Sequence, residues 1–484
     1  MKYTLVLLTL GWFFLFFSIA LGIPLGVSLL EKDWQNAILF ASLAGILIFI
    51  GGGIVLLLHK REKDSYFTKK EALLSVSLMW IFAGFLGGLP FYFSGAIPDL
   101  IGAVFESVSG FTTTGSSVLT DIESLPKSIL FWRSFTHYLG GLGIVVLLVA
   151  FFPAIGIGAR ALFQAEGPGV ESGELRPKVR QTAMTLFKIY LLFTFLETFL
   201  LWGLGMTFFD ALCHTFGTLA TGGFSTKNAS IAYYDSVAIE VVIIIFMILS
   251  AINFSLYYYL AYGKKELVWK NTEVKFFLCS IAIVTLGIAF HLSLVNGGSF
   301  WHHLRESAFQ VVSLHTCTGF ATADYEKWTS ASQIFLLFIM IIGGSLGSTA
   351  GGIKMVRFVV VIRYLYNRCL QFFHPKGTFV VRLNGEPLSS ETVQEVVGLF
   401  CLWLLFLAIA SLSLSFMGLD MSTSLSATIT TMSGVGPGIG MVGPMDNFSS
   451  IPALGKLVLI LCMLLGRLEI YTLLVIFLPA FWKK

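Results

Sequence analysis

Four short segments rich in glycine, threonine and serine recur along the chain, and each lies between two long apolar stretches. They cover residues 105–115, 212–222, 309–319 and 426–436, and their last glycines are 107, 97 and 117 residues apart. Near-constant spacing of this kind indicates an internal repeat. Backbone carbonyl groups of such loops can replace the hydration shell of a cation. Glycine permits the left-handed conformations that this requires, and threonine hydroxyl groups add further acceptors.

These loops cannot face lipid, because irregular backbone at membrane depth must be buried in protein or line water. One cluster of small residues would be explained by close helix packing, whereas four in register favour a pore. The segment leading into each loop is about 10–14 residues long, which is typical of a re-entrant helix. Helices that enter from the outer face direct about half a negative charge toward the membrane centre, which favours a cation there. We expect Pro98-Asp99, Asp210 and Asp420 to cap these helices.

A glycine-rich segment at residues 343–352 interrupts an apolar stretch that otherwise predicts a membrane span. Its five glycines cost roughly 5 kcal/mol of helix propensity relative to alanine, at about 1 kcal/mol each. We therefore expect the helix to be broken there. Close helix packing is the alternative, because residues 343, 347 and 351 keep a GxxxGxxxG spacing.

Arg467 lies within the last apolar stretch. An arginine at the bilayer centre costs roughly 3 kcal/mol on insertion scales, so its side chain must face a cavity or a partner. One interpretation places this positive charge in the pore, below the cation site. The other is a structural salt bridge with Glu197, Glu240 or Glu469.

The composition restricts the class of protein. Of 484 residues, 56% are hydrophobic and 12% are charged, and the mean hydropathy is +0.84. The apolar content excludes intrinsic disorder, and apolar stretches of about 20 residues favour membrane helices over a β-barrel. The six cysteines stand singly without a CxxC motif, so neither a disulfide framework nor a cysteine metal site is supported. A net charge of +4 indicates no acidic partner, and nucleic-acid binding is not expected.

Ten membrane spans are predicted, so successive loops lie on alternate sides of the membrane. Lys and Arg concentrate in the loops on one of these sides. By the positive-inside rule, that side is the cytoplasm, and both termini face it. Loops assigned to it hold 21 of the 31 Lys and Arg residues. The predicted spans cover residues 3–30, 37–58, 72–93, 127–156, 182–205, 236–262, 276–295, 332–363, 393–416 and 453–481.

The predicted fold is an all-α polytopic membrane protein with two leading spans and four like-oriented repeats. Each repeat comprises a span, a pore loop and a second span, so the four can close around a central pore with pseudo-fourfold symmetry. An inverted-repeat transporter would instead turn alternate units upside down. The expected units are two extra N-terminal helices at 1–66 and the repeats at 67–165, 166–265, 266–380 (with the glycine-rich loop) and 381–484.

Residues 109–115, 220–226, 316–322 and 433–438 resemble the four pore loops of the Trk/Ktr/HKT potassium-transporter superfamily. Trp132-Arg133 and the segment 139–143 are similar to the second span of its first repeat, and the two leading spans resemble the extra domain of its TrkH branch. The resemblance covers essentially the whole chain.

This resemblance implies a K⁺-selective filter with one glycine per repeat, at Gly115, Gly222, Gly319 and Gly436. Glycine rather than serine at 115 favours K⁺ over Na⁺ within this superfamily. The expected potassium filter comprises Thr112, Thr113, Thr114, Gly115, Ala220, Thr221, Gly222, Cys317, Thr318, Gly319, Gly434, Val435 and Gly436. The expected gate comprises Arg467 with Gly343, Gly344, Gly347, Ser348, Thr349, Gly351 and Gly352.

The resemblance also implies a homodimer in the inner (plasma) membrane of a bacterium, regulated by a cytosolic TrkA-type RCK protein that binds NAD(H) or ATP/ADP. No nucleotide site is expected on this chain. K⁺ uptake through a gated pore is the leading function. The alternative is a K⁺ symporter coupled to H⁺ or Na⁺, with Glu106, Glu197, Glu240 and Glu469 as candidate sites. An enzyme is not expected, and Cys213, His214, His315 and Cys317 are interpreted as packing residues rather than metal ligands.

Overall fold

The computed structural model describes residues 1–59, 68–143, 179–261 and 263–483. Helices dominate this part of the chain, and its only strands form a small antiparallel hairpin of β1 (Arg382–Leu383) and β2 (Glu386–Pro387). The all-α architecture predicted from the sequence is confirmed. Residues 60, 61, 63, 160, 176, 178 and 484, which were used to assign the inner loops, lie outside the described residues.

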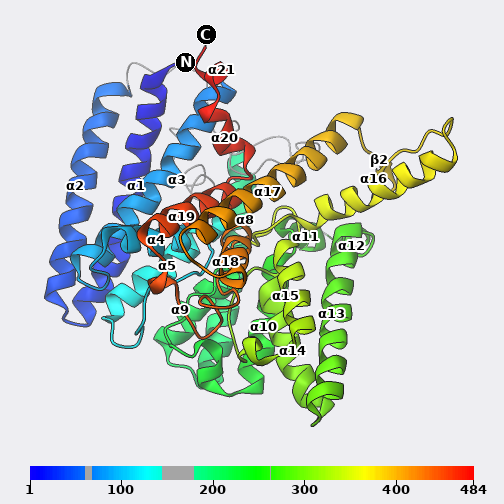
Figure 1. Cartoon of the computed structure of the whole chain (residues 1–484). Coiled ribbons are helices and arrows are strands. Elements are labelled where there is room, and N and C mark those ends of the chain that lie inside the picture. Colours follow the sequence, from blue (N-terminus) through cyan, green and yellow to red (C-terminus); the bar gives the residue numbers. More distant parts are fainter. Residues whose placement is uncertain (60–67, 144–178, 262, 484) are drawn as a thin grey trace.

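Two leading helices, α1 (Tyr3–Leu30) and α2 (Trp34–Leu58), pack against each other and against the first repeat. Phe17 and Phe40 are fully buried, and their rings meet the indole of Trp132 at centroid distances of 5.9 and 6.3 Å. Aromatic burial of this kind fixes the leading pair on one side of the bundle (Figure 1).

Four repeats follow, each with a long helix, a short helix, a returning loop and a second helix or helix pair. Repeat one contains α3 (Lys69–Phe93), α4 (Leu100–Phe111) and α5 (Lys127–Leu142). Repeat two contains α8 (Val179–Gly203), α9 (Phe208–Leu219), α10 (Val237–Ala251) and α11 (Phe254–Ala261), and α12 (Lys265–Trp269) follows it. Repeat three contains α13 (Thr272–Asn296), α14 (Phe300–His315), α15 (Ser330–Ile341) and α16 (Met355–Phe373). Repeat four contains α17 (Ser390–Phe416), α18 (Met421–Ser433), α19 (Ala453–Arg467), α20 (Tyr471–Phe477) and α21 (Pro479–Trp482).

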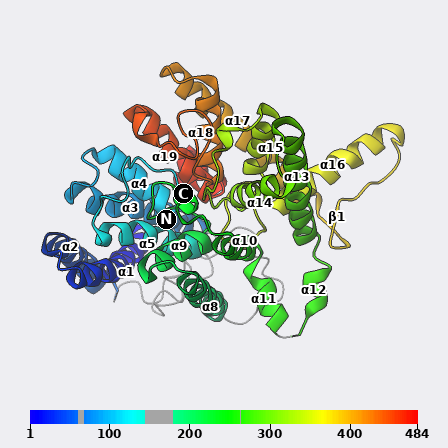
Figure 2. The ribbon, with the colours of Figure 1, turned by 90° about the horizontal axis from the view of Figure 1, so that it is seen from below.

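The four repeats occupy successive sectors around a common centre, in sequence order (Figure 2). The short helices α4, α9, α14 and α18 lie toward this centre, and the leading helices lie outside repeat one. Single-turn 3₁₀ helices in the outer connections cover Ser230–Tyr234, Tyr325–Lys327 and Phe448–Ser450. Helix α16 extends away from the bundle in both views, and α1 begins at the same end of the molecule at which α21 ends (Figure 1).

Six described helices are long and apolar enough to cross a membrane, or eight if each of two bent pairs is one span. The predicted span 236–262 bends by 94° between α10 and α11, and the predicted span 453–481 bends by 117° between α19 and α20. Both were expected to be continuous, so these two predictions are wrong in detail. The predicted span 332–363 is broken between Ile341 and Met355, where the glycine-rich segment predicts a break. The span predicted at 127–156 is described only to residue 143.

Two of the three predicted helix caps are confirmed. Asp99 accepts hydrogen bonds from the Gly102 and Ile101 amides, and Asp420 accepts one from the Thr423 amide. Asp210 is not the cap of α9, because Thr207 fills that position and accepts the Asp210 amide at 3.1 Å. The Asp210 carboxylate still lies in the first turn, near the positive end of the helix. The division of the chain at residues 66, 165, 265 and 380 stays a prediction.

Candidate functional site

The four short helices end in the same backbone turn. In each, an amide donates a 2.8 Å hydrogen bond to the carbonyl five residues earlier, and the residue before that amide has a left-handed conformation. This is the pattern of a Schellman turn. The donor–acceptor pairs are Thr114–Ser109, Gly222–Gly217, Thr318–Ser313 and Val435–Thr430, and the left-handed residues are Thr113, Thr221, Cys317 and Gly434.

A second left-handed residue follows two positions later, and it is a glycine in every repeat. The φ angles are 85° at Gly115, 77° at Gly223, 80° at Gly319 and 98° at Gly436. The register of repeat two therefore differs from the predicted one: Gly223, not Gly222, is equivalent to Gly115. Two consecutive glycines stand at this point, and the Gly-Phe pair at 223–224, which matches the pair at 319–320, is the sequence signal that the prediction did not use.

These four glycines close a ring of backbone contacts. A Cβ atom added to Gly115 would collide with the carbonyl oxygen of Gly222, and one on Gly223 with that of Thr318. A Cβ on Gly319 would meet the carbonyl oxygen of Val435, and one on Gly436 would lie 2.9 Å from that of Thr114. We call residues 112–115, 220–223, 316–319 and 433–436, which are not β-strands, filter strands one to four. Each filter strand thus packs its glycine against the next one in the order one, two, three, four, one. Only glycine fits both this approach and the positive φ.

The structure brings the thirteen predicted filter residues together in these four strands. Their side chains are buried or partly buried, as expected for backbone that avoids lipid. Hydroxyl pairs brace two of the strands: Thr112 Oγ1 lies 2.8 Å from Thr114 Oγ1, and Thr316 Oγ1 lies 2.8 Å from Thr318 Oγ1. The prediction omitted Gly223 and the residues equivalent to Thr112 in repeats three and four, Thr316 and Ser433.

A cavity of about 180 Å³ lies directly beside the ring. Thr112, Thr114, Ser433 and Gly434 line it on the filter side, and residues 346–352 of the glycine-rich segment line it on the other. Three charged side chains also line it, namely Lys354, Arg467 and Glu469.

Arg467 ends α19 and reaches between the filter and the glycine-rich segment. Its guanidinium lies 3.5 Å from Thr113 Oγ1 and 3.5 Å from the carbonyl oxygen of Thr349, and it donates to the carbonyl oxygens of Gly140 and Gly141. The residues suggested as salt-bridge partners are engaged elsewhere in two cases: Glu469 pairs with Arg357 and Glu240 with Arg305.

The segment between α15 and α16 is an ordered loop with a paired neck. The Gly343 amide donates to the Ile353 carbonyl at 2.9 Å, and the Ile353 amide donates to the Ile341 carbonyl at 3.0 Å. Next to the neck, a Cβ on Gly351 would collide with the carbonyl oxygen of Ser433, so the loop touches filter strand four. We call residues 342–353 the barrier loop.

The barrier loop also explains the unexpected bend in repeat two. Ser345 donates its amide to the Ala251 carbonyl at 2.8 Å, and Gly347 accepts the Phe254 amide at 3.1 Å. These backbone groups flank the break between α10 and α11, where a continuous helix would have used them internally. The two irregular segments therefore satisfy each other.

A buried ion pair supports filter strands one and two from behind. Arg133 Nε lies 2.7 Å from Glu106 Oε1, and both side chains are almost completely buried. Arg133 also donates to the Ser225 carbonyl at 2.8 Å and lies 3.7 Å from the centroid of the Phe224 ring. Glu106 accepts the Val118 amide at 2.8 Å.

His137 lies one helical turn after Arg133 and contacts the same two repeats. Its Nδ1 is 2.8 Å from the Gly110 carbonyl, and its Nε2 accepts the Phe224 amide at 3.2 Å. Sequence analysis missed His137 and gave Arg133 only as part of a resemblance. Their i, i+4 spacing on an otherwise apolar span was the available signal.

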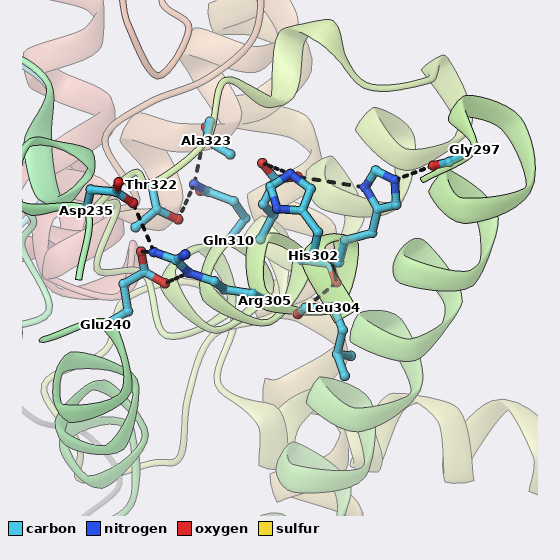
Figure 3. Close-up of polar contacts among 12 residues, drawn as sticks. Asp235, Glu240, Gly297, His302, Leu304, Arg305, Gln310, Thr322 and Ala323 are labelled. Atoms are coloured by element: carbon cyan, nitrogen blue, oxygen red, sulfur yellow. Dashed lines mark hydrogen bonds and ion pairs between the residues drawn. The ribbon is translucent and has the colours of Figure 1, made fainter. Parts of the chain in front are cut away.

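Repeat three is braced on its outer side by charged and amide groups (Figure 3). Arg305 binds Glu240 through two nitrogen–oxygen contacts of 2.8 Å and lies 3.4 Å from Asp235. Gln310 donates to the Ala323 carbonyl at 3.2 Å, which holds the chain leaving filter strand three. Bidentate arginine–carboxylate pairing adds geometric specificity.

The histidines near the loops serve as hydrogen-bonding residues. His214 contacts the Asp210 carbonyl and Ser225 Oγ at 2.7 and 2.9 Å, and His315 contacts Ser280 Oγ and the Ile342 carbonyl at 2.8 and 2.7 Å. Among the described residues, no group of three or more His, Cys, Asp or Glu side chains is arranged to hold a metal ion.

Comparison with known proteins agrees with this architecture. A family model described as "TrkH: Cation transport protein" matches residues 38–484. The chain belongs to the TrkH family. It is 34% identical to the Trk system potassium uptake protein TrkH of Halomonas elongata, with both chains covered in full, and 35% identical to that of Escherichia coli K12, with 98% of each covered. The crystal structure of the potassium transporter TrkH from Vibrio parahaemolyticus superposes with a TM-score of 0.89 at 33% identity, over 100% of both chains.

Membership in this family identifies a multi-pass inner-membrane protein with two leading helices and four pore repeats. The names of these relatives describe transporters and not enzymes, in agreement with the expectation for this chain.

Removing one member of the Glu106–Arg133 pair should destabilise the protein strongly. Glu106→Leu leaves a buried, uncompensated arginine, which costs about 3–5 kcal/mol. The double variant Glu106→Leu/Arg133→Leu should regain part of this loss. Thermal unfolding in detergent measures both. The exposed pair Glu31–Lys127 is the matched control, because Glu31→Ala should cost less than about 1 kcal/mol. Equal melting temperatures for Glu106→Leu and Glu31→Ala would contradict this assignment.

Proposed function

We propose that the chain takes up K⁺ through the ring formed by its four filter strands. The observation that carries this proposal is the closed cycle of glycine–carbonyl contacts from Gly115 to Gly436, which concentrates backbone oxygens around one axis. Carbonyl rings of this kind select among cations by replacing their hydration shells. The names of the relatives, which are potassium uptake proteins, support K⁺ as the transported ion.

Arg467 and the barrier loop form the gate in this proposal. The guanidinium occupies the cavity next to Thr113, so a cation leaving the filter meets a fixed positive charge. The barrier loop closes the other side of the same cavity with residues Gly343, Gly344, Gly347, Ser348, Thr349, Gly351 and Gly352 at or near its wall. Opening requires that both move away from the axis.

A coupled symporter receives less support from the geometry. Of the four candidate carboxylates, Glu106, Glu240 and Glu469 are each paired with an arginine. Glu197 is buried on α8, and no described cation pairs with it. A carboxylate held by arginine is a poor site for reversible binding of H⁺ or Na⁺, because the arginine already neutralises it.

The proposed assembly is a homodimer with both termini in the cytoplasm, regulated by a cytosolic TrkA-type RCK protein that binds NAD(H) or ATP/ADP. The closeness of the α1 start to the α21 end supports termini on one side (Figure 1). Described basic residues on the proposed inner connections, such as Lys264, Lys265 and Lys270, offer positive charge to an acidic docking surface.

Gly223→Ala should abolish ion preference, because its Cβ would collide with the Thr318 carbonyl in a left-handed conformation. In reconstituted vesicles, we expect K⁺ and Rb⁺ uptake to exceed Na⁺ uptake in the parent and to lose this excess in the variant. Gly203→Ala on α8 is the control, because a Cβ there meets no atom within 4 Å. A parent with no preference among alkali cations would refute the filter proposal.

Arg467→Ala should raise Rb⁺ flux through the isolated chain by at least about tenfold. Two unit charges 4 Å apart repel by about 4 kcal/mol at an effective dielectric constant near 20, and about 1.4 kcal/mol suffices for a tenfold change in rate. Arg467→Lys keeps the charge and should stay closer to the parent. Unchanged flux in Arg467→Ala and in a deletion of residues 346–350 would remove the gate from the proposal.

The regulatory partner is tested by purifying the chain from native membranes in mild detergent. We expect a cytosolic protein that binds an adenine nucleotide to copurify, and nucleotide addition to change Rb⁺ flux of the complex but not of the isolated chain. Copurification of the transporter alone, with flux insensitive to NAD(H), ATP and ADP, would count against this part.

A further inference from the structure

Glu273 lies next to the barrier loop but belongs to another element. It stands in the first turn of α13 and is 7% exposed, and the hairpin residue Asn384 holds the start of this helix by accepting the Thr272 amide at 2.9 Å. One oxygen of its carboxylate, Oε1, accepts the Leu346 amide at 2.8 Å and the Val356 amide at 3.1 Å. A single side-chain atom therefore holds both sides of the loop.

The two amides lie at different places along the chain. Leu346 belongs to the barrier loop and lines the cavity, whereas Val356 lies in the first turn of α16. An opening movement that carries α16 away from the axis separates these two amides or withdraws both from Glu273. Hydrogen bonds to an ionised acceptor are about twice as strong as those between neutral groups. The closed arrangement, in which Glu273 accepts both amides, is therefore more stable than one that lacks either bond.

The remaining contacts of the loop lead to the same junction. Lys354 Nζ donates to the Ala350 carbonyl and so binds the last residues of the loop to the start of α16. Met355 donates its amide to the Gly344 carbonyl at 3.1 Å. One turn on, Arg357 pairs with Glu469, two residues after Arg467. Residues 354–357 thus connect the barrier loop, α16 and Glu469, which follows the arginine of the cavity, and Val356 joins them to Glu273 on α13.

Helix α16 extends from this junction away from the bundle, so it can transmit a force to it. The helix runs away from the bundle (Figure 1, Figure 2), and its far half exposes large apolar residues such as Phe372 and Phe373. A force on that half acts on the first turn, where the Val356 amide meets Glu273.

We propose that Glu273 is a positioning residue for transport: its carboxylate holds the barrier loop closed by binding the Leu346 and Val356 amides together, and release of α16 from it opens the pathway. This inference rests on the proposed function of the barrier loop as part of a gate. Glu273 does not contact the filter, so its removal changes how often the pathway is open and leaves the preference among cations unchanged.

The test compares Rb⁺ flux through the full chain in reconstituted vesicles. Glu273→Ala removes two hydrogen bonds to a charged acceptor and should raise flux about tenfold or more, since loss of one such bond already corresponds to about tenfold. Glu273→Gln keeps an oxygen acceptor and should restore most of the closure. Glu266→Gln on α12 is the matched control, because that carboxylate is exposed and pairs only with Lys270 among the described residues. The ratio of Rb⁺ to Na⁺ flux should be the same in all of them.

Two further arms separate this inference from the gate itself. In a chain lacking residues 346–350, Glu273→Ala should add nothing to the raised flux. If Glu273→Ala does not fold, Val356→Pro removes one donor instead, at a helix turn that tolerates proline, and should raise flux likewise. Raised flux in the loop deletion with parental flux in Glu273→Ala and Val356→Pro overturns the role of Glu273 alone. Parental flux in the loop deletion and in Arg467→Ala overturns the gate and this inference together.

Discussion

One constraint governs the irregular segments of this structure. Non-helical backbone at membrane depth must form its hydrogen bonds within the protein. The filter strands meet it at their amides through the four Schellman turns, which leave the carbonyls of Thr114, Gly222, Thr318 and Val435 around the axis. The barrier loop meets it by bonding to the break in repeat two and to its own neck. One amide of each filter strand is thus satisfied by its own helix, and under the proposed function the carbonyls are available to an ion.

The four repeats share the turn but not the side chains that support it. Strands one and two are held by the buried Arg133–Glu106 pair and by His137, whereas strand three relies on Gln310 and on Ser313, whose hydroxyl donates to the Phe320 carbonyl at 2.6 Å. The chain leaving strand four is held by Tyr325, which donates to the Gly438 carbonyl at 3.0 Å. A single chain can therefore conserve a ring of backbone oxygens while each quadrant is braced differently, which a homotetramer cannot do.

The sequence predicts most of this architecture because its strongest signals are local. Hydropathy locates the spans, and four glycine–threonine clusters at near-constant spacing locate the filter strands. It fails where a tertiary contact decides the outcome. The choice of Gly222 over Gly223 is a different kind of error, because the Gly-Phe pair at 223–224 matches the pair at 319–320 and was available in the sequence. The bend after Ala251 depends on amides that the barrier loop contributes about 100 residues later, and no local sequence pattern predicts it. Asp210 loses the cap position to Thr207, another residue type that is preferred at helix N-caps, three positions earlier.

Three charged side chains line the cavity, and among them the Arg467 guanidinium lies 3.5 Å from Thr113 Oγ1 of the filter. Glu469 is turned toward Arg357 by the left-handed conformations of residues 469 and 470, the same conformations that end α19 at Arg467. In a straight continuation of α19, Glu469 would lie on a different face of the helix from Arg467, because residues two positions apart do not face each other. The bend between α19 and α20 therefore has two consequences. The guanidinium of Arg467 donates to carbonyl oxygens of repeat one and of the barrier loop, and Glu469 is anchored to α16 through Arg357. Because these contacts meet at one break in the last span, we expect a shift of α16 to reach Arg467 through the Arg357–Glu469 pair.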